Sequence, residues 1–266
     1  MVRSLWTGAS GMITQQANTD VISNNLANVN THGFKKQRAE FEDLLYQTMR
    51  VAGTPATEDT VVPVGVQMGH GAKLAATQRV FSQGAPQQTD VPTDLAVFGE
   101  GFFRVQMYDG SWAYTRNGAF KIDETGRMVT SNGYWLLPDI VMPELFLIDT
   151  INITKDGRVS VKVPQGDELV EVDVGRIELY RFPNPVGLSA VGENLFKVSA
   201  ASGDAIPGIP GYEGMGTLQH KFLEMSNVQI VQEMVNLIVA QRAYEFNSRT
   251  IQTSDNMLGT ATTLKR

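Results

Sequence analysis

The C-terminal stretch is the part of the sequence that most restricts the fold, because its pattern predicts one long helix. No proline occurs between residues 226 and 266, and Gly259 is the one glycine there. Ser226 and Gln229 have the spacing of a helix capping box, which predicts that the helix begins here. At 1.5 Å per residue, a helix over most of this stretch is about 50–60 Å long, which exceeds the diameter of a small domain. We therefore expect that it does not fold back onto a single core.

Apolar residues of this predicted helix recur at every seventh position. They are Ile230, Leu237, Tyr244, Ile251 and Leu258, and the stripe is widened in its first half by Val231, Val235 and Ile238. A seven-residue apolar period is typical of a seam that faces another helix. An apolar stripe more often belongs to an ordinary core, but the length of this helix and the weakness of any helical partner favour a seam between subunits. We take the five residues of the period as candidates for an assembly interface.

Residues 2–26 carry a weaker helical pattern. One apolar stripe is predicted by Val2, Leu5, Ala9, Met12, Ile13, Ala17 and Val21, which recur at steps of three or four. Asparagines at five positions between residues 18 and 30 lower the helix propensity, and Gly33 lies where a helix stop is expected. We assign Leu5, Met12 and Leu26 to the same candidate assembly interface. A second short helix is expected over residues 35–49.

The middle of the chain, residues 66–222, changes to a period of two and is interrupted by turn signals. The hairpin dipeptides are Asp109-Gly110, Asn117-Gly118, Asn132-Gly133 and Asp156-Gly157. They separate strand-like runs of mostly β-branched and aromatic residues. This spacing predicts antiparallel β-structure in a sandwich or barrel-like body.

Two segments have the composition of connections. Residues 51–66 are rich in threonine, valine, glycine and proline and have no helical period, which predicts an extended arm. Val61, Val62 and Val64 are its candidates for burial against a neighbouring subunit. Residues 200–216, with two prolines and several glycines, predict a second flexible connection.

The expected fold class is α+β. Long N- and C-terminal helices pair into an inner coiled-coil-like layer, and the middle forms an antiparallel all-β body. Residues 1–46 with 226–266 form a terminal helical assembly domain, residues 47–66 an extended arm or linker, and residues 67–225 the β-rich body. A helix with one apolar stripe must bury that stripe, and contact with other copies is the economical way to do so.

Composition restricts the functional class. The absence of cysteine excludes disulfides, thiolate metal sites and a cysteine nucleophile. The net charge of −6 is unevenly spread, because residues 1–50 and 226–266 each carry +1 and the middle carries −8. Nucleic acid is not an expected partner, since binding phosphate needs a basic face. No apolar run reaches the roughly 18–20 residues of a membrane span, and residues 4–20 lack the apolar core of a cleaved signal peptide.

The sequence predicts no catalytic, cofactor or metal site. His32, His70 and His220 are scattered, without the short spacing of zinc ligands. The glycines of residues 65–71 lack the lysine and the strand-to-helix context of a phosphate-binding loop. Carboxylates in residues 170–174 alternate with valines, which places them on the wet face of a strand. We therefore expect neither an enzyme nor a cofactor.

Two long terminal motifs, and several in the middle, resemble those of one family. The run Ser23-Asn24-Asn25-Leu26-Ala27-Asn28-Val29-Asn30-Thr31-His32-Gly33-Phe34-Lys35 is similar to the N-terminal signature of flagellar rod, hook and hook-associated axial proteins. Residues 224–245 resemble the matching C-terminal signature, and residues 99–103, 113–118 and 126–130 resemble core motifs of the rod proteins. Within this family, residues 47–79 are most similar to the distal rod type.

This resemblance implies a structural subunit that polymerises into a rigid hollow drive shaft between motor and hook. The terminal helices would pair and stack around a central channel, with the β body outside them. Export would use the flagellar type III apparatus without a cleaved signal peptide, and the rod would lie in the periplasm as part of the basal body. The implied partners are other copies in a helical polymer, other rod proteins, the hook protein and the ring bushing.

Two alternatives stay open from the sequence. One is a hook or proximal rod protein of the same family, which the shape and stiffness of the polymer would distinguish. The other is a secreted β-rich binding module, which needs a polar constellation in the β body that the sequence does not show.

Overall fold

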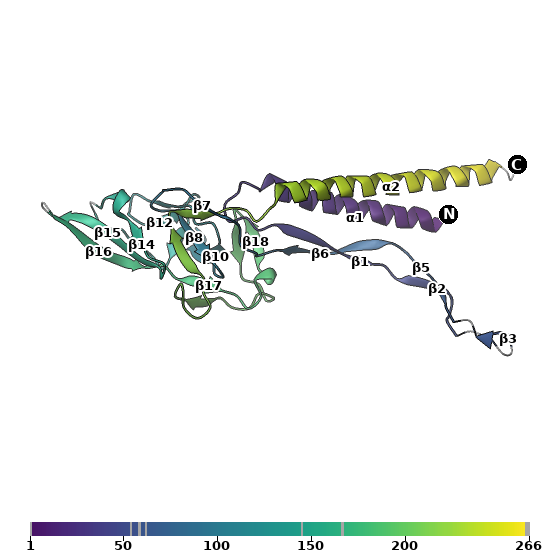
Figure 1. The fold of residues 1–266 in the computed structure, drawn as a ribbon, viewed down its shortest axis with the longest axis horizontal. Helices are drawn as coiled ribbons and strands as arrows, with labels where there is room; N and C mark the ends of the chain where they lie inside the picture. The colour runs from purple at the N-terminus through teal and green to yellow at the C-terminus, as the bar shows by residue number, and fades with distance from the viewer. Residues whose placement is uncertain are drawn as a thin grey trace. The chain divides into compact units, whose positions relative to one another are not determined.

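The chain divides into two compact units in the computed structural model, which describes residues 2–53, 55–57, 60–61, 63–144, 146–165 and 168–263 (Figure 1). One unit, the terminal unit, consists of Met1–Ala27, Gln37–Gln78 and Gln229–Arg266. The other, the β body, consists of Asn28–Lys36 and Arg79–Val228. Each unit is described by itself below.

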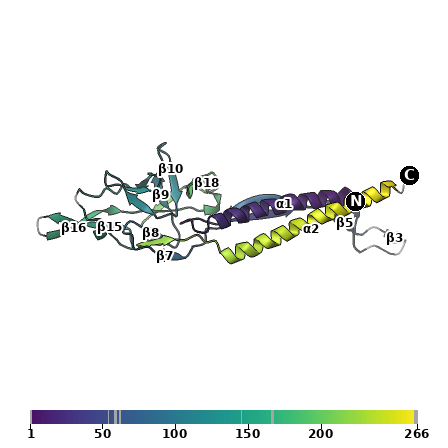
Figure 2. The ribbon, with the colours of Figure 1, turned by 90° about the horizontal axis from the view of Figure 1, so that it is seen from above.

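Two long helices lie side by side in the terminal unit (Figures 1 and 2). Helix α1 spans Val2–Ala27 and helix α2 spans Ile230–Thr263. Ser4 bonds to Ser254 near one end of the pair and Asn25 bonds to Glu233 near the other, so the helices are antiparallel. The two predicted terminal helices are confirmed.

The start of α2 differs from the capping-box prediction. The carbonyl oxygen of Gln229 accepts the N–H of Glu233 at 3.0 Å, and this bond opens the helix. The hydroxyl oxygen of Ser226 instead accepts the N–H of Val228 at 3.3 Å, which forms a local turn before the helix. The prediction that Ser226 caps α2 is therefore wrong, because its hydroxyl accepts a bond from Val228 in the turn before the helix.

Small residues let the two helices approach closely. A Cβ atom added to Gly11 would lie 2.7 Å from the side-chain nitrogen of Asn247, and one added to Gly8 would lie 3.0 Å from the side chain of Ile251. On α2, Ala240 is almost fully buried. The close approach of the helix backbones therefore depends on positions without a large side chain.

A two-stranded antiparallel ribbon forms the rest of the terminal unit. Its strand pairs are β1 (Gln37–Asp43) with β6 (Ala72–Arg79), β2 (Tyr46–Arg50) with β5 (Val66–Gly69), and β3 (Pro55–Thr57) with β4 (Thr60–Val61). The ribbon lies beside α1, and the amide of Asn25 holds the start of β1 through both the N–H and the carbonyl of Gln37 at 2.8 Å.

The prediction of a short helix over residues 35–49 is wrong, because this segment contains strands β1 and β2 of the ribbon. Its charged residues Arg38, Glu40 and Glu42 alternate with apolar ones, which is the period of a strand. Glu42 also pairs with Lys73 on β6 at 3.1 Å. Pairing with a segment about thirty residues away decides the conformation here, and a local pattern cannot show that pairing.

The β body is built on a seven-stranded antiparallel sheet in the order β11-β12-β13-β9-β10-β19-β18. Its strands are β9 (Phe103–Gln106), β10 (Trp112–Thr115), β11 (Phe120–Ile122), β12 (Met128–Thr130), β13 (Trp135–Leu137), β18 (Ser189–Gly192) and β19 (Leu195–Lys197). The α+β fold class with an antiparallel middle is confirmed.

Smaller sheets complete the body. A three-stranded sheet consists of β14 (Asn152–Ile153), β15 (Arg158–Gln165) and β16 (Glu168–Arg176). The two-stranded pairs are β17 (Leu179–Arg181) with β20 (Ile206–Gly208), β21 (Thr217–His220) with β8 (Leu95–Phe98), and β22 (Phe222–Glu224) with β7 (Pro86–Gln88). Two short 3₁₀ helices, η1 (Ile148–Thr150) and η2 (Pro185–Gly187), lie in its connections.

Three of the four predicted hairpin dipeptides join paired strands. Asp109-Gly110 connects β9 to β10, Asn132-Gly133 connects β12 to β13, and Asp156-Gly157 connects β14 to β15. Asn117-Gly118 does not, because β10 and β11 are not neighbours in the sheet. Gly118 is needed there for space, since a Cβ atom would collide with the carbonyl oxygen of Leu95.

The core of the β body contains apolar side chains from nearly all of its strands. Phe103 and Phe120 meet edge to face at its centre, with ring centroids 5.1 Å apart. A second cluster is aromatic and is formed by Phe102, Tyr114, Tyr180, Phe182, Leu188 and Phe196. The side chain of His220 lies half-buried at the end of β21, where its Nε2 is 2.7 Å from the carbonyl oxygen of Pro92.

We predict that His220 makes the β body less stable in mild acid. Burial lowers the pKa of His220 below its ordinary value of 6.5, although the bond to Pro92 opposes the shift. The unfolded chain therefore takes up a proton at a higher pH than the folded chain, and stability is lost as the pH falls through 6.5 toward the folded-state pKa. Urea unfolding between about pH 7 and pH 5 should show a steeper loss in the wild type than in His220→Gln, whose amide can still donate to Pro92. Parallel pH profiles in the two proteins would contradict this assignment.

Candidate assembly surface and buried charge cluster

The residues of the predicted seven-residue stripe on α2 differ in their exposure. Ile251 lies against Gly8 of α1, and Leu258 is half-buried, whereas Ile230 and Tyr244 are exposed. Leu237, between them, is half-buried. The residues of the stripe therefore do not share one environment, and Ile251 is a member that packs against α1.

The face of α2 that meets α1 is small and polar. Glu233, Ala240, Asn247 and Ser254 follow a seven-residue period of their own. Glu233, Ala240 and Ser254 are buried, and Asn247 fills the space beside Gly11. Sequence reasoning missed this face because it searched for apolar residues. The signal that could have revealed it is the seven-residue period of small and polar residues on α2, taken together with the glycines of α1.

Polar bonds fix the register of the helix pair. The Ser4 and Ser254 hydroxyls are 2.9 Å apart, and the buried Asn25 amide donates to the Glu233 carboxylate at 3.3 Å. Because these groups are buried and bonded, sliding one helix along the other would leave polar atoms without partners. The pairing of α1 with α2 therefore has one favoured register.

Large apolar side chains cover the opposite face of α2. Ile230, Val231, Met234, Val235 and Ile238 are between 48% and 77% exposed, and we call them the α2 patch. Glu233 is the one charged residue between positions 229 and 241, and it is buried on the other face. Of this patch, only Ile230 belongs to the predicted seven-residue period. Val231, Val235 and Ile238 are the residues that the sequence pattern adds beside it, and Met234 is not predicted.

Helix α1 also leaves apolar side chains open. Trp6 is 71% exposed and Ile13 is 69% exposed, and we call these two residues the α1 patch. The three α1 residues predicted for assembly, Leu5, Met12 and Leu26, are half-buried. Their role in assembly stays a prediction.

The predicted arm lies at the far part of the ribbon. Val64 is exposed, and the backbone of Val61 belongs to β4. Val62 lies outside the described residues, as does the side chain of Val61. The part of the arm that the structure describes includes the short strands β3 and β4, which pair with each other, and its contact with a neighbour stays a prediction.

A buried charge cluster holds the two ends of the β-body sequence together. The Glu224 carboxylate receives the Lys35 ammonium at 2.6 Å on one oxygen and Arg116 Nε at 2.9 Å on the other. Lys35 and Glu224 are each 1% exposed. Burial lowers the pKa of Lys35, although the Glu224 carboxylate opposes the shift.

Every strong donor in the cluster has a partner. Lys35 also donates to the carbonyl oxygen of Ser82 at 2.8 Å, and the N–H of Gly84 donates to Glu224 at 2.9 Å. Arg116 Nη1 donates to the carbonyl oxygens of Gly99 at 2.8 Å and Gly101 at 2.6 Å. The cluster therefore joins five separate stretches of the chain through one carboxylate. Sequence reasoning missed it, because buried partners 189 residues apart leave no local pattern.

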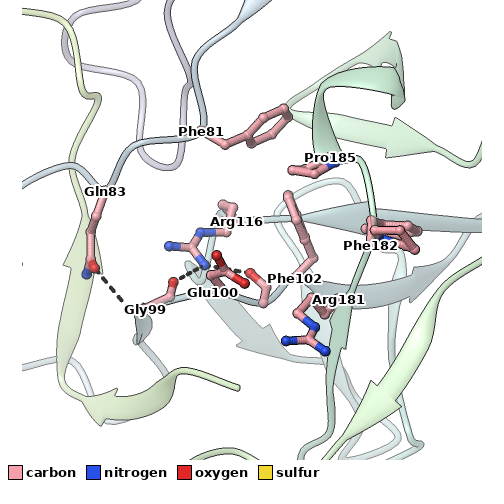
Figure 3. Close-up of a pocket in the computed structure, with 11 residues that line it drawn as sticks. Phe81, Gln83, Gly99, Glu100, Phe102, Arg116, Arg181, Phe182 and Pro185 are labelled. Carbon is pink, nitrogen blue, oxygen red and sulfur yellow. Dashed lines mark hydrogen bonds between the residues drawn. The ribbon is translucent and has the colours of Figure 1, made fainter. Parts of the chain in front are cut away.

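A cavity of about 370 Å³ lies beside Arg116 in the β body (Figure 3). Its walls are largely apolar and include Phe81, Phe102 and Phe182, with Glu100 and Arg181 as further charged residues. Arg116 is already committed to Glu224 and to backbone carbonyls, so it is not free to bind an anion. Among the described lining residues there is no serine, threonine, cysteine, lysine or histidine. The cavity can hold an apolar side chain, but it lacks a nucleophile with an adjacent base.

Over the described ranges, no group of three or more histidine and acidic side chains is arranged to hold a metal ion. Neither α1 nor α2, as far as they are described, is apolar enough to cross a membrane.

We predict that Glu224→Gln destabilises the protein by about 3–5 kcal/mol, because it leaves Lys35 and Arg116 buried without a counter-charge. Lys35→Met should cost clearly less, since it leaves a balanced pair of Arg116 with Glu224. Asp173→Asn, which removes the partner of Arg158 in an exposed ion pair, is the control and should cost less than about 1 kcal/mol. Urea unfolding of the three variants gives the order, and equal effects of Glu224→Gln and Asp173→Asn would contradict the role of the cluster.

Both ends and the middle of the chain match known protein families. Residues 5–35 match the family described as flagella basal body rod protein. Residues 96–161 match the flagellar hook protein FlgE/F/G D1 domain, and residues 219–264 match the flagellar basal body rod FlgEFG protein C-terminal family.

Relatives that align over the whole chain include flagellar basal-body rod proteins named FlgG. The flagellar basal-body rod protein FlgG of Borreliella burgdorferi is 59% identical over 266 residues, which is 100% of both chains. FlgG of Caulobacter vibrioides is 46% identical over 99% of this chain and 100% of its own. The flagellar hook protein FlgE of Helicobacter mustelae is 37% identical, but the match covers 71% of this chain and 41% of that protein. The chain therefore belongs to the family of FlgG flagellar basal-body rod proteins and is a structural rod subunit of the flagellum.

Proposed function

We propose that copies of this chain polymerise into the distal rod, a rigid hollow drive shaft that transmits torque from the motor to the hook. The observation that carries this proposal is the pair of apolar patches that α1 and α2 leave open. Within the chain the helices are already joined through small and polar residues. Their large apolar side chains are therefore available for neighbouring subunits.

The size of the patches favours a polymer over an isolated dimer. Fully burying one Val, Ile or Met side chain stabilises by about 1.5–3 kcal/mol, so the half-exposed α2 patch can supply about 4–8 kcal/mol. Association costs about 4–15 kcal/mol in lost freedom of motion. The gain from one such contact nearly equals the cost of association. A subunit that contacts several neighbours at once is held firmly.

The partners proposed are other copies of the chain, other rod proteins, the hook protein and the ring bushing, with the rod in the periplasm. Support comes from the rod-protein names of the relatives and from the motifs at both ends of the chain. The uneven charge also suits this assembly, because nearly neutral ends can stack while the acidic middle stays hydrated.

A division of labour along the chain follows from the same proposal. Residues 1–46 with 226–266 serve as the assembly domain, residues 47–66 as the inter-subunit arm, and residues 67–225 as the outer body. The ribbon supports a role for the arm, because an isolated two-stranded hairpin is marginally stable in water. Contact with a neighbour through residues such as Val64 would stabilise it further.

Electron microscopy of purified flagellar bases tests the proposal. Cells that lack this chain should yield bases whose shaft ends before the distal segment, and expression of the wild-type chain should restore it. Straight, stiff shafts are expected, which separates a rod from a flexible hook. Complete shafts in cells without the chain would refute the function proposed here.

We predict that deleting residues 54–62 leaves the subunit folded but yields a more bendable rod. A paired, proline-containing segment loses less chain entropy on docking than a flexible tether, so it can resist sliding of adjacent subunits. The measurement is the curvature and number of rods in electron micrographs. Deletion of the body turn residues 110–111 is the control for a shortened hairpin elsewhere. Rods of the first variant as straight and numerous as wild type would show that the arm is a passive linker.

A further inference from the structure

The cavity beside Arg116 has largely apolar walls and a volume suited to a small ligand. Its volume is about 370 Å³, which falls in the range of about 300–1,000 Å³ that is common for small-molecule sites. Three phenylalanines and two prolines form much of the wall, namely Phe81, Phe102, Phe182, Pro183 and Pro185. The ring of Phe102 meets those of Phe81 and Phe182 edge to face, with centroids 5.5 and 5.6 Å apart. Because the rings hold one another, this wall is formed before any ligand enters.

One cation that lines the cavity has no partner. The guanidinium of Arg181, at the end of β17, makes no hydrogen bond or ion pair within the part of the chain that the structure describes (Figure 3). Glu100 also lines the cavity, but no ion pair joins these two side chains over the described residues. Arg116 differs, because Glu224 and backbone carbonyls occupy its donors. A guanidinium presents a planar fork of N–H donors that matches a carboxylate, so Arg181 is the group here that can bind an anion.

The buried charge cluster places further positive charge beside the same cavity. Lys35 and Arg116 are both cations, and they share the single carboxylate of Glu224. Burial lowers the pKa of Lys35, the Glu224 carboxylate opposes this shift, and the Arg116 cation adds to it. Since Arg116 lines the cavity, a ligand carboxylate there would lie near cations that have too little negative charge between them. The cavity therefore favours an anion, although the chain as a whole is acidic.

We propose that this cavity binds an apolar carboxylate, whose carboxyl group pairs with Arg181 and whose aromatic or aliphatic part fills the space among the phenylalanines. The site belongs to the β body alone and does not depend on the proposed rod function. One negative charge suits it better than the two of a phosphate, because the Glu100 carboxylate at the cavity repels added charge. A free aromatic acid and the C-terminal carboxylate of a peptide that ends in phenylalanine both offer this chemistry.

Calorimetric titration of the full-length protein with phenylacetate and with its neutral amide, phenylacetamide, tests the site. We expect the acid to bind with a Kd of about 0.1–1 mM and the amide about 10-fold or more weakly, because the amide cannot form the charge-assisted bond to Arg181. Arg181→Met keeps the apolar stem and removes the charge, so it should bind both compounds equally weakly. Arg158→Gln removes an exposed arginine of the same body and is the matched control, which should keep the preference of the wild type.

An introduced cysteine locates the bound acid, since the chain has no native cysteine. Pro183→Cys, in the wall of the cavity, should react with iodoacetamide about 10-fold more slowly when the phenylacetate concentration is about ten times its Kd, by mass action. Phenylacetamide at the same concentration should protect it much less. Val186→Cys is the matched control, because Val186 is 41% exposed and is not part of the described lining. Its reaction rate should be the same with and without the acid.

A peptide that ends in phenylalanine, compared with its C-terminally amidated form, distinguishes the two sources of the carboxylate. Binding of the free-ended peptide assigns the site to a chain end, binding of phenylacetate alone assigns it to a free acid, and either result supports the carboxylate site. The site is overturned if the wild type binds neither, if it binds acid and amide equally, if Arg181→Met keeps the preference, or if Pro183→Cys is not protected. These outcomes leave the rod function untouched, because microscopy of flagellar bases tests that function separately.

Discussion

Close contact between α1 and α2 at positions with small side chains is the constraint on which the terminal unit depends. Gly8 and Gly11 bring the helix backbones near each other, and Ala240 and Ser254 complete the seam. A seam of this kind gains little from hydrophobic burial, so its register is set by bonded polar groups such as Asn25 and Glu233. Because much of the seam uses small residues, several large apolar side chains, among them Val231 and Met234, stay exposed. The pattern inside the chain thereby determines which surface is left for other copies.

The Glu224 cluster plays the corresponding part in the β body. It joins Lys35, which follows α1 in the sequence, to Glu224, which precedes α2, and so both ends of the body are held at one carboxylate. A buried ion cluster is not a strong source of stability in itself, because desolvation offsets most of the attraction. It is selective, however, since only one arrangement satisfies two cations and one anion at once. The body must therefore fold with residues 28–36 in place, although these residues are separated from residue 79 by the whole ribbon.

Sequence patterns sufficed for the features that depend on neighbours in the chain. The apolar steps of three and four predicted α1, the uninterrupted C-terminal stretch predicted α2, and three turn dipeptides predicted hairpins in the body. They failed where distant residues decide. Residues 37–50 became strands because residues 66–79 pair with them, and Glu224 is paired with partners far away in the sequence. The candidate interface on α2 stays a prediction, because a local pattern shows which residues share a helix face and not which surface another copy covers.

An exposed apolar patch is normally a liability, and the position of the α2 patch shows how it is contained. Its residues lie on a regular helix and not on a strand, so no free strand edge accompanies the apolar surface. The patch is half-buried by its own neighbours, which keeps the gain from any single contact close to the cost of association. A subunit that meets one other copy is then bound weakly, and one that enters a growing end contacts several at once. The same feature that makes each contact weak therefore confines assembly to the end of an existing polymer.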